Sequence, residues 1–441
     1  MASLQLDLPV PAGLPSTPER RSFTTHALTE GLPSPPATPD ELRFPRTSGP
    51  TAHPPTVAII GTGYVGKHLV GAFNRHYPVI AYDIKSESLP SALKTGTRYQ
   101  LTTTTDPEIL SQASIFLVSV PTVLQADLQS INTEPLETAV ETLRMYAPPK
   151  STVVVESSVA VGMTRSLFCS LTEEPYNMLV GMSPERVDPG RQIPAFESIP
   201  KIVSGLNHLA LKSIIQIYST VFEKVVPVSQ PEVAEMTKLY ENCQRMMCIT
   251  LANEMADACY EIGIHHGEIS KAAATKPFGY LPVTASPGIG GHCIPVNPWY
   301  LVSTSKSWPT LEFATRRSKL RPARLAQRLL ENVSFQNPRI LVVGFGFKPG
   351  QSLTTNSPGV DFALALYDLL SVRGRLFDIQ YYDPLVPHGT AHGHIKRWTD
   401  WRKSSLECCF DVIAVLMRQD GIDWGVLERC DPDKVNIIYE C

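Results

Sequence analysis

A glycine-rich turn near residue 61 constrains the fold of this chain more than any other feature. The apolar run TVAIIG (56–61) ends at the sequence GTGYVG (61–66), and YVGKHLVGAFNRHY (64–77) has the spacing of a helix. A second apolar run, PVIAYD (78–83), ends at an acidic residue. Because strand, turn, helix and strand follow one another directly, this segment predicts a βαβ unit.

Each glycine of this turn has a predicted role in binding a dinucleotide. Gly61 permits the tight turn, Gly63 lets the backbone approach a pyrophosphate, and Gly66 permits close packing of helix on strand. The helix N-terminus stabilises the phosphate charge. Asp83 can accept hydrogen bonds from the adenosine ribose, which favours NAD over NADP, although Lys85 weakens that preference. The alternative is a structural glycine turn in another kind of α/β domain.

Later segments extend the pattern to a second α/β unit. A long helical stretch covers 231–264, and another strand begins at RILVVG (339–344) and leads into a helix. We therefore predict an α/β protein with two Rossmann-like, doubly wound parallel-sheet domains joined by a long central helix. Apolar residues recur on one face of that helix and are expected to be its packing face: Val233, Met236, Tyr240, Met247, Leu251 and Met255.

These patterns divide the chain into four parts. Residues 1–54 are rich in Pro, Ser and Thr, which predicts a disordered tail or, alternatively, a docking or Ser/Thr-Pro phosphorylation segment whose partner is unknown. We expect an NAD-binding domain over 55–210 and a central helical domain with a cysteine loop over 211–330. The second α/β domain is expected over 331–441.

Composition excludes several classes of function. The chain has 441 residues and a net charge of −3, which gives no field for a polyanion and disfavours a nucleic-acid partner. No apolar run reaches the ~18 residues that a membrane span needs, and no secretory signal is evident. Nine scattered cysteines are typical of reduced thiols in a cytoplasmic protein. No His and Cys residues show metal-ligand spacing, so no metal site is predicted.

The segment SPGIGGHCIPVNP (286–298) is the second chemical signal. Its glycines would leave the thiol of Cys293 accessible, and backbone amides around it can stabilise a thiolate or an oxyanion. The alternative is that Cys293 is a small buried hydrophobic residue, as most cysteines are.

Charged and amide residues elsewhere suggest further parts of a site. Lys238 and Asn242 are four residues apart on the long helix and share a face, where they could hold an oxyanion or simply be solvated. Glu185 in SPERVDPG follows a strand, where it could act as a general base or belong to a surface turn. Lys348 in GFGFKPG (344–350) is placed to meet a phosphate, although this segment is not a Walker loop.

The order of these motifs closely resembles the UDP-glucose/GDP-mannose dehydrogenase family over about residues 56–441. The series runs GTGYVG, Asp83, VSVPT, ESSVAVGMT, SPERVDPG, IPKIVSG, EMTKLYENCQR, GIGGHCIPVNPWYL, GFGFKPG and NSP. SPERVDPG and IPKIVSG are most similar to the branch that acts on UDP-N-acetylhexosamines. In the UDP-glucose branch, the position of Pro189 is usually Glu.

This resemblance implies an NAD-dependent oxidation of a sugar CH2OH to a carboxylate in two steps. Cys293 would trap the aldehyde as a thiohemiacetal, which is then oxidised to a thioester and hydrolysed. Lys238 and Asn242 would stabilise the oxyanions, with Glu185 acting in hydrolysis. The family also implies a homodimer or higher oligomer formed through the central helix. The residues implied to bind NAD are Gly61, Gly63, Tyr64, Val65, Gly66, Asp83, Pro121, Thr122 and Ser158, and those implied to bind the nucleotide sugar are Phe278, Gly279, Tyr280 and Lys348.

Three positions depart from the family pattern. Asn297 stands where the family has an Asp that positions water and tunes the lysine–cysteine pair, so Lys238 should be less stabilised as a cation. Thr355 replaces an Arg expected near the substrate, and Val123 replaces a Pro. Three alternatives therefore remain: a non-catalytic or impaired nucleotide-sugar-binding protein, a UDP-glucose or GDP-mannose 6-dehydrogenase, and a simpler hydroxyacid-type dehydrogenase.

Overall fold

The structure is a computed structural model. The Pro-rich tail up to residue 53 lies outside the described residues, as do Pro189 and most of the histidine-containing segment HGTAHGHIKR. The described residues are 54–90, 99–125, 131–188, 190, 193–333, 335–374, 376–387 and 394–439.

The N-terminal half of the described chain forms an eight-stranded sheet in the order β10-β9-β8-β7-β4-β1-β2-β3. Helix α1 (Tyr64–Phe73) follows β1, and α4 (His208–Val221) follows β9. Two further helices are α2 (Glu134–Tyr146) and α3 (Met163–Phe168), and a short hairpin pairs β5 (Val123–Leu124) with β6 (Ile131–Asn132). The strands are β1 Val57–Ile60, β2 Val79–Tyr82, β3 Leu101–Thr104, β4 Ile115–Val118, β7 Thr152–Val155, β8 Leu179–Met182, β9 Lys201–Gly205 and β10 Val225–Pro227.

Helices cover both faces of this sheet, as the doubly wound prediction requires. Alternate residues of β1 point to opposite faces: Ala58 packs in one core with Leu136 and Leu143 of α2. Val57 packs in the other core with Leu69 of α1 and Ile214 of α4. The predicted fold class is confirmed.

One strand pair differs from the predicted parallel order. β9 runs antiparallel to β8, whereas its other neighbour, β10, is parallel to it. A parallel pairing needs a crossover, usually an α-helix, and the chain between β8 and β9 contains only the short 3-10 turn Phe196–Ser198 in its described part. Helix α4 then supplies the crossover to β10.

The C-terminal half contains a five-stranded sheet in the order β13-β12-β11-β14-β15, with every described pair parallel. Its strands are β11 Arg339–Val343, β12 Asp378–Tyr382, β13 Lys396–Arg397, β14 Val412–Val415 and β15 Asn436–Tyr439. One face packs on α9 (Pro358–Val372) and on Leu325 and Leu329 of α8. The other face packs on α10 (Lys403–Cys409) and α11 (Gly425–Glu428), through Leu406 and Val426.

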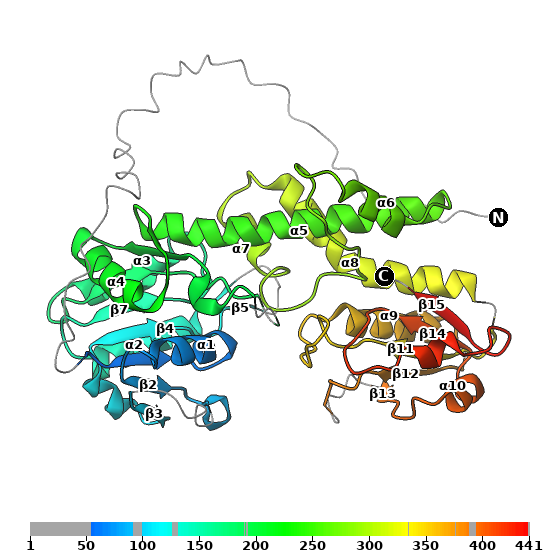
Figure 1. The fold of residues 1–441 in the computed structure, drawn as a ribbon, viewed down its shortest axis with the longest axis horizontal. Helices are drawn as coiled ribbons and strands as arrows, with labels where there is room; N and C mark the ends of the chain where they lie inside the picture. The colour runs from blue at the N-terminus through cyan, green and yellow to red at the C-terminus, as the bar shows by residue number, and fades with distance from the viewer. Residues whose placement is uncertain are drawn as a thin grey trace, which may run out of the picture. The chain divides into compact units, whose positions relative to one another are not determined.

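Between the two sheets the chain forms α5 (Pro231–Glu261), α6 (His266–Ala273), α7 (Asn297–Thr304) and α8 (Pro309–Asn332). Helix α5 is continuous over 31 residues, as the sequence predicts (Figure 1). Its predicted packing face is wrong in part: Met236 and Met247 are half-buried against the core that holds Leu239 and Tyr300, but the other four residues are exposed. Tyr240 and Leu251 are 65% and 63% exposed, and Val233 and Met255 are exposed as well.

The opposite face of α5 is the buried one, and it carries small and polar side chains. These residues make hydrogen bonds and close contacts within the chain, which apolar periodicity cannot detect because it scores only hydrophobic side chains. They include Ala234, Glu235, Lys238, Leu239, Cys243, Met246, Thr250, Asn253, Ala256 and Cys259.

Candidate active site

The turn after β1 has the backbone geometry that a dinucleotide requires. Gly61 has φ +88°, and a Cβ there would lie 2.8 Å from the carbonyl oxygen of Ser119. A Cβ on Gly66 would lie 2.0 Å from the carbonyl oxygen of Gly61, so helix and strand approach too closely for any side chain. At Gly63, the residue before α1, nothing lies within 4 Å of the Cβ position. This open space at a helix N-terminus fits a pyrophosphate.

The acid at the end of β2 also fits a dinucleotide. Asp83 is half-buried, and its Oδ2 accepts hydrogen bonds from the backbone N (2.8 Å) and hydroxyl (3.3 Å) of Thr62. Its Oδ1 accepts from the backbone N of Lys85 at 2.9 Å. The carboxylate is therefore fixed beside the glycine turn, with lone pairs left for ribose hydroxyls. The neighbours Tyr64 and Val65 begin α1.

The cysteine loop, which we define as residues 286–296, is fastened to the segment that follows β11. The backbone N of Gly291 donates to the carbonyl of Thr355 at 3.1 Å, and Asn356 Nδ2 donates to the carbonyl of Gly291 at 2.9 Å. Thr355 thus contributes its backbone where the family pattern has an Arg side chain. Cys293 itself is exposed, and its carbonyl accepts from the backbone N of Asn297 at 2.9 Å.

The structure brings Cys293 and Lys238 together electrostatically. Desolvation raises the pKa of the Cys293 thiol, and the positive charge of Lys238 opposes that rise. Burial lowers the pKa of the Lys238 ammonium, and the charges of Cys293 and Glu185 oppose that shift. Each group therefore favours the charged form of the other, although burial shifts both pKa values in the opposite direction.

Asn242 and Asn297 form a direct pair in the same region. Asn242 Nδ2 donates to Asn297 Oδ1 at 2.5 Å, and Asn297 is buried at the first position of α7. The amide at position 297 therefore accepts a hydrogen bond, but it carries no negative charge toward Lys238. Further along α7, Trp299 and Tyr300 are buried.

The hydroxyl of Tyr300 links α7 to the end of β4. It donates to the carbonyl of Thr122 at 3.1 Å, and burial raises the pKa of Tyr300 to about 12, so the hydroxyl stays protonated. Thr122 is half-buried, Pro121 before it is exposed, and Ser158 after β7 is half-buried. The predicted NAD residues of β4 and β7 thus follow parallel neighbouring strands.

Glu185 lies deeper than the sequence predicts for a residue facing a cleft. Its side chain is 5% exposed, and Oε2 accepts from Lys201 Nζ at 2.7 Å. Oε1 accepts from the backbone N of Arg186 and of Val187, at 2.5 and 2.9 Å. Both carboxylate oxygens are therefore held in place, and the charge is balanced by a buried lysine.

That lysine joins a second carboxylate, and the sequence interpretation missed both residues. Lys201 Nζ also donates to Glu156 Oε2 at 2.7 Å, and the hydroxyl of Tyr218 donates to Glu156 Oε1. Burial raises the pKa of Glu156 to about 7, against the opposing charge of Lys201. A lysine at the first position of an apolar strand, as in KIVSG, is the signal that could have found this network.

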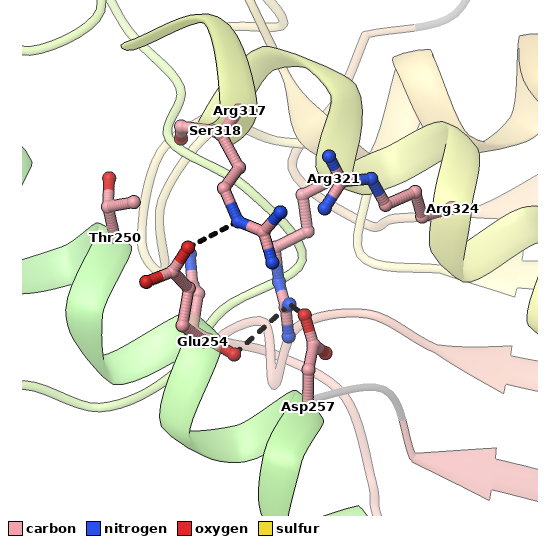
Figure 2. Close-up of a pocket in the computed structure, with 8 residues that line it drawn as sticks. Thr250, Glu254, Asp257, Arg317, Ser318, Arg321 and Arg324 are labelled. Atoms are coloured by element: carbon pink, nitrogen blue, oxygen red, sulfur yellow. Dashed lines mark hydrogen bonds and ion pairs between the residues drawn. The ribbon is translucent and has the colours of Figure 1, made fainter. Parts of the chain in front are cut away.

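The root of the cysteine loop is pinned between α5 and α8. Asn253 Oδ1 accepts from the backbone N of Ser286 at 2.7 Å, and Arg321 Nε donates to the carbonyl of Ser286 at 2.8 Å. Arg321 is buried and also pairs with Asp257. Figure 2 shows Arg317 and Arg321 of α8 pointing toward Glu254 and Asp257 of α5. The cavity between them holds about 10 Å³, room for about one water, so it is a structural junction.

The predicted substrate residues are not all together. Phe278 is 70% exposed, and the ammonium of Lys276 lies 4.9 Å from its ring centroid. Gly279 has φ +73°, and Tyr280 is half-buried. Lys348 lies on the loop after β11 and donates to Asp188 Oδ1 at 2.8 Å, so it faces the segment that carries Glu185.

Several known proteins are similar in sequence to this chain. The model of the NAD-binding domain of the UDP-glucose/GDP-mannose dehydrogenase family matches residues 81–226, and the model of its central domain matches residues 232–315. Protein CapL of Staphylococcus aureus is 31% identical over 321 residues, which cover 66% of this chain and 74% of CapL. The chain belongs to the UDP-glucose/GDP-mannose dehydrogenase family.

Other members of this family support the same assignment. The UDP-N-acetyl-D-mannosamine dehydrogenase of Pyrococcus horikoshii is 28% identical over 75% of this chain and 84% of its own length. A solved structure of the UDP-D-ManNAc dehydrogenase of that organism has a TM-score of 0.73, covers 87% of this chain and 94% of its own, and is 25% identical. As a member of this family, this chain is an oxidoreductase that uses NAD and acts on a nucleotide sugar.

Two kinds of feature are absent from the described residues. No group of three or more His, Cys, Asp or Glu side chains there could hold a metal ion. No helix in the same part of the chain is long and apolar enough to cross a membrane.

Proposed function

We propose that this dehydrogenase oxidises the C6 hydroxymethyl group of a UDP-N-acetylhexosamine to a carboxylate. The observation that carries the proposal is that an exposed cysteine, Cys293, and a buried lysine, Lys238, interact electrostatically in a chain that also has a glycine turn suited to NAD. The relative from Pyrococcus horikoshii is a UDP-N-acetyl-D-mannosamine dehydrogenase, which supports an N-acetylhexosamine over glucose as the sugar.

The proposed chemistry needs a nucleophile, an oxyanion site and water. NAD, when bound, accepts one hydride from C6 in each of the two oxidations. Cys293 adds to the aldehyde to form a thiohemiacetal, whose oxidation gives a thioester, and water then releases the carboxylate and restores the thiol. Lys238 and Asn242 hold the oxygen on C6 as its negative charge develops.

Glu185 and Asn297 support this chemistry by stabilising or positioning the side chains that hold the oxyanion. The charge of Glu185 is held in place by Lys201 and stabilises Lys238 as a cation, and in hydrolysis its carboxylate orients the water. Asn297 fixes Asn242 through their hydrogen bond. Gly61, Gly63, Tyr64, Val65, Gly66, Asp83, Pro121, Thr122 and Ser158 would bind NAD, and Phe278, Gly279, Tyr280 and Lys348 the nucleotide sugar.

We also propose a domain organisation, an oligomeric state and a location in the cell. We keep the four-part division at residues 54 and 330, but the predicted boundary at 210 moves to the end of β10 at Pro227, because α4 and β10 complete the N-terminal sheet. A homodimer through α5 would cover the exposed apolar face formed by Val233, Tyr240, Leu251 and Met255. The eight cysteines in the described part of the chain are all free thiols, which supports a reducing, cytoplasmic location.

NADH formation tests the proposal directly. Purified protein is given NAD with UDP-GlcNAc, UDP-ManNAc, UDP-glucose or GDP-mannose, and absorbance is followed at 340 nm beside a Cys293→Ala control. We expect turnover on a UDP-N-acetylhexosamine, with two NADH for each carboxylate formed, and its loss in the variant. One NADH per sugar would identify a simple alcohol oxidation instead.

A second candidate, a nucleotide-sugar-binding protein without turnover, is favoured by one observation. The amide of Asn297 leaves Lys238 without the family's neighbouring carboxylate. Binding of NAD and of a UDP-sugar with no NADH on any substrate would favour that candidate. Recovery of turnover in Asn297→Asp would then locate the defect.

A further inference from the structure

Asp188 places a carboxylate between two cations that come from different elements. It follows β8, three residues after Glu185, and its Oδ1 accepts from Lys348 Nζ at 2.8 Å. Its Oδ2 lies 3.6 Å from Arg245 Nη1 on α5. The side chains of Asp188, Lys348 and Arg245 are 20%, 34% and 46% exposed, so the group is accessible from solvent.

The same two loops touch at a second point. Gly190 has φ +83°, and a Cβ there would lie 3.1 Å from Gln351 Nε2. The segment after β8 therefore lies against the loop after β11 both at the Asp188–Lys348 contact and at Gly190. Gln419 Nε2 holds that loop in turn, through the carbonyl of Gln351 at 3.1 Å.

Asp188 also lies close enough to the reactive thiol to act on its charge. Its carboxylate raises the pKa of Cys293, adding to desolvation, while Lys238 opposes the rise. The negative charge of Asp188 thus acts both on the two cations, Lys348 and Arg245, and on the thiol of Cys293.

We propose that Asp188 is a specificity-determining residue that competes with the diphosphate of the nucleotide sugar for Lys348 and Arg245. This inference rests on the proposed function, in which Lys348 meets the nucleotide sugar. The carboxylate of Asp188 offsets part of the positive charge that Lys348 and Arg245 would offer to a doubly charged diphosphate. The carboxylate therefore lowers affinity for anionic ligands, and it does so more strongly for a doubly charged diphosphate than for a ligand with a single negative charge.

Removing the negative charge of Asp188 should strengthen the binding of UDP. Asp188→Asn keeps the shape and an acceptor oxygen but raises the local net charge by one. Affinity for UDP should rise about fivefold to tenfold at low ionic strength, and the gain should shrink with added salt because the groups are partly exposed. NAD affinity should not change.

Isothermal titration of UDP into wild-type protein and Asp188→Asn, at low and high salt, tests this. Glu312→Gln is the matched control, because it removes one carboxylate from an exposed pair with Arg316 on α8. Tighter, salt-sensitive UDP binding in Asp188→Asn alone would support the proposal. Equal or weaker binding would overturn it, since Asp188 would then only position Lys348.

Failure of the proposed function gives a different result. If neither protein binds UDP while both bind NAD, the nucleotide-sugar assignment fails and the role of Asp188 fails with it. If UDP binds only to Asp188→Asn, the competition is stronger than proposed. A second readout is the pH profile of Cys293 alkylation, which should shift to lower pH in Asp188→Asn and stay unchanged in Glu312→Gln.

Discussion

The two large sheets carry the same turn after a central strand, but only one of the two turns is left open. Gly61 after β1 and Gly344 after β11 have φ +88° and +91°. A Cβ on either would strike a carbonyl oxygen just after a neighbouring strand, that of Ser119 after β4 or that of Met417 after β14. In each sheet the backbone N of this glycine donates to the carbonyl of a tyrosine, Tyr82 or Tyr382, and an aspartate follows that tyrosine.

The difference lies in the segment that joins each glycine to its helix. Helix α1 begins three residues after Gly61, so the space beside Gly63 stays empty. Helix α9 begins only at Pro358, and the intervening loop folds back until a Cβ on Gly346 would lie 2.4 Å from the carbonyl oxygen of Gln351. The loop fills the space where a dinucleotide would bind and instead presents Lys348. A shared strand-end geometry therefore does not imply a shared ligand.

The strongest test of this comparison is Gly61→Ala beside Gly344→Ala. Positive φ and a blocked Cβ should cost each variant about 3 kcal/mol of unfolding free energy or more. Only Gly61→Ala should also lose NAD affinity, by about 100-fold. Urea unfolding and calorimetric NAD titration of the folded protein measure the two effects, and equal loss of NAD affinity in both variants would remove the distinction.

The two aspartates should separate stability from binding. Asp383 is fully buried and accepts from the backbone N of Phe345 and Gly346, each at 2.9 Å, and from Gln419 Nε2. Asp383→Ala leaves these donors unsatisfied and should cost about 3 kcal/mol without changing NAD affinity. Asp83→Ala should cost about 1 kcal/mol and weaken NAD about tenfold. The reverse pattern would show that the C-terminal turn holds the cofactor.

The pH dependence of stability should distinguish the two sheets further. Among the described residues, a buried carboxylate–lysine pair, Glu156 with Lys201, lies in the N-terminal sheet and none lies in the C-terminal sheet. The pKa of Glu156 is raised from 4.5 to about 7, so the folded state binds more protons than the unfolded state between these values. The free energy of unfolding should therefore fall as pH rises through that range. Glu156→Gln should flatten this part of the profile, and an unchanged slope would assign it to other groups.

The smallest effect on stability is expected for Gly63→Ala. Its Cβ meets nothing and its φ is −63°, so unfolding free energy should change by only about 0.5 kcal/mol. NAD affinity should nevertheless fall about tenfold, because the methyl group enters the pyrophosphate space. Gly71→Ala, also with open space at its Cβ within α1, is the control and should leave NAD binding intact.

Local patterns were sufficient to predict the elements but not what they contact. The turn at Gly61, the acid at Asp83 and the long helix α5 follow from spacing, because each depends on nearby residues. The outward apolar face of α5 and the antiparallel β9 could not be read in this way, since both depend on which distant segment packs alongside. For the same reason Lys201 and Glu156 were missed: they lie 45 residues apart and meet only across the sheet.

Because α5 is one continuous helix, the number of residues between Lys238 and Asn253 sets the distance between these two parts of the site. Lys238, beside the thiol, and Asn253, at the root of the cysteine loop, lie on one uninterrupted helix about 22 Å apart at 1.5 Å per residue. A single inserted or deleted residue between them would turn one relative to the other by about 100°. Substitutions on the outer face can accumulate over time, whereas this stretch should resist any change in length.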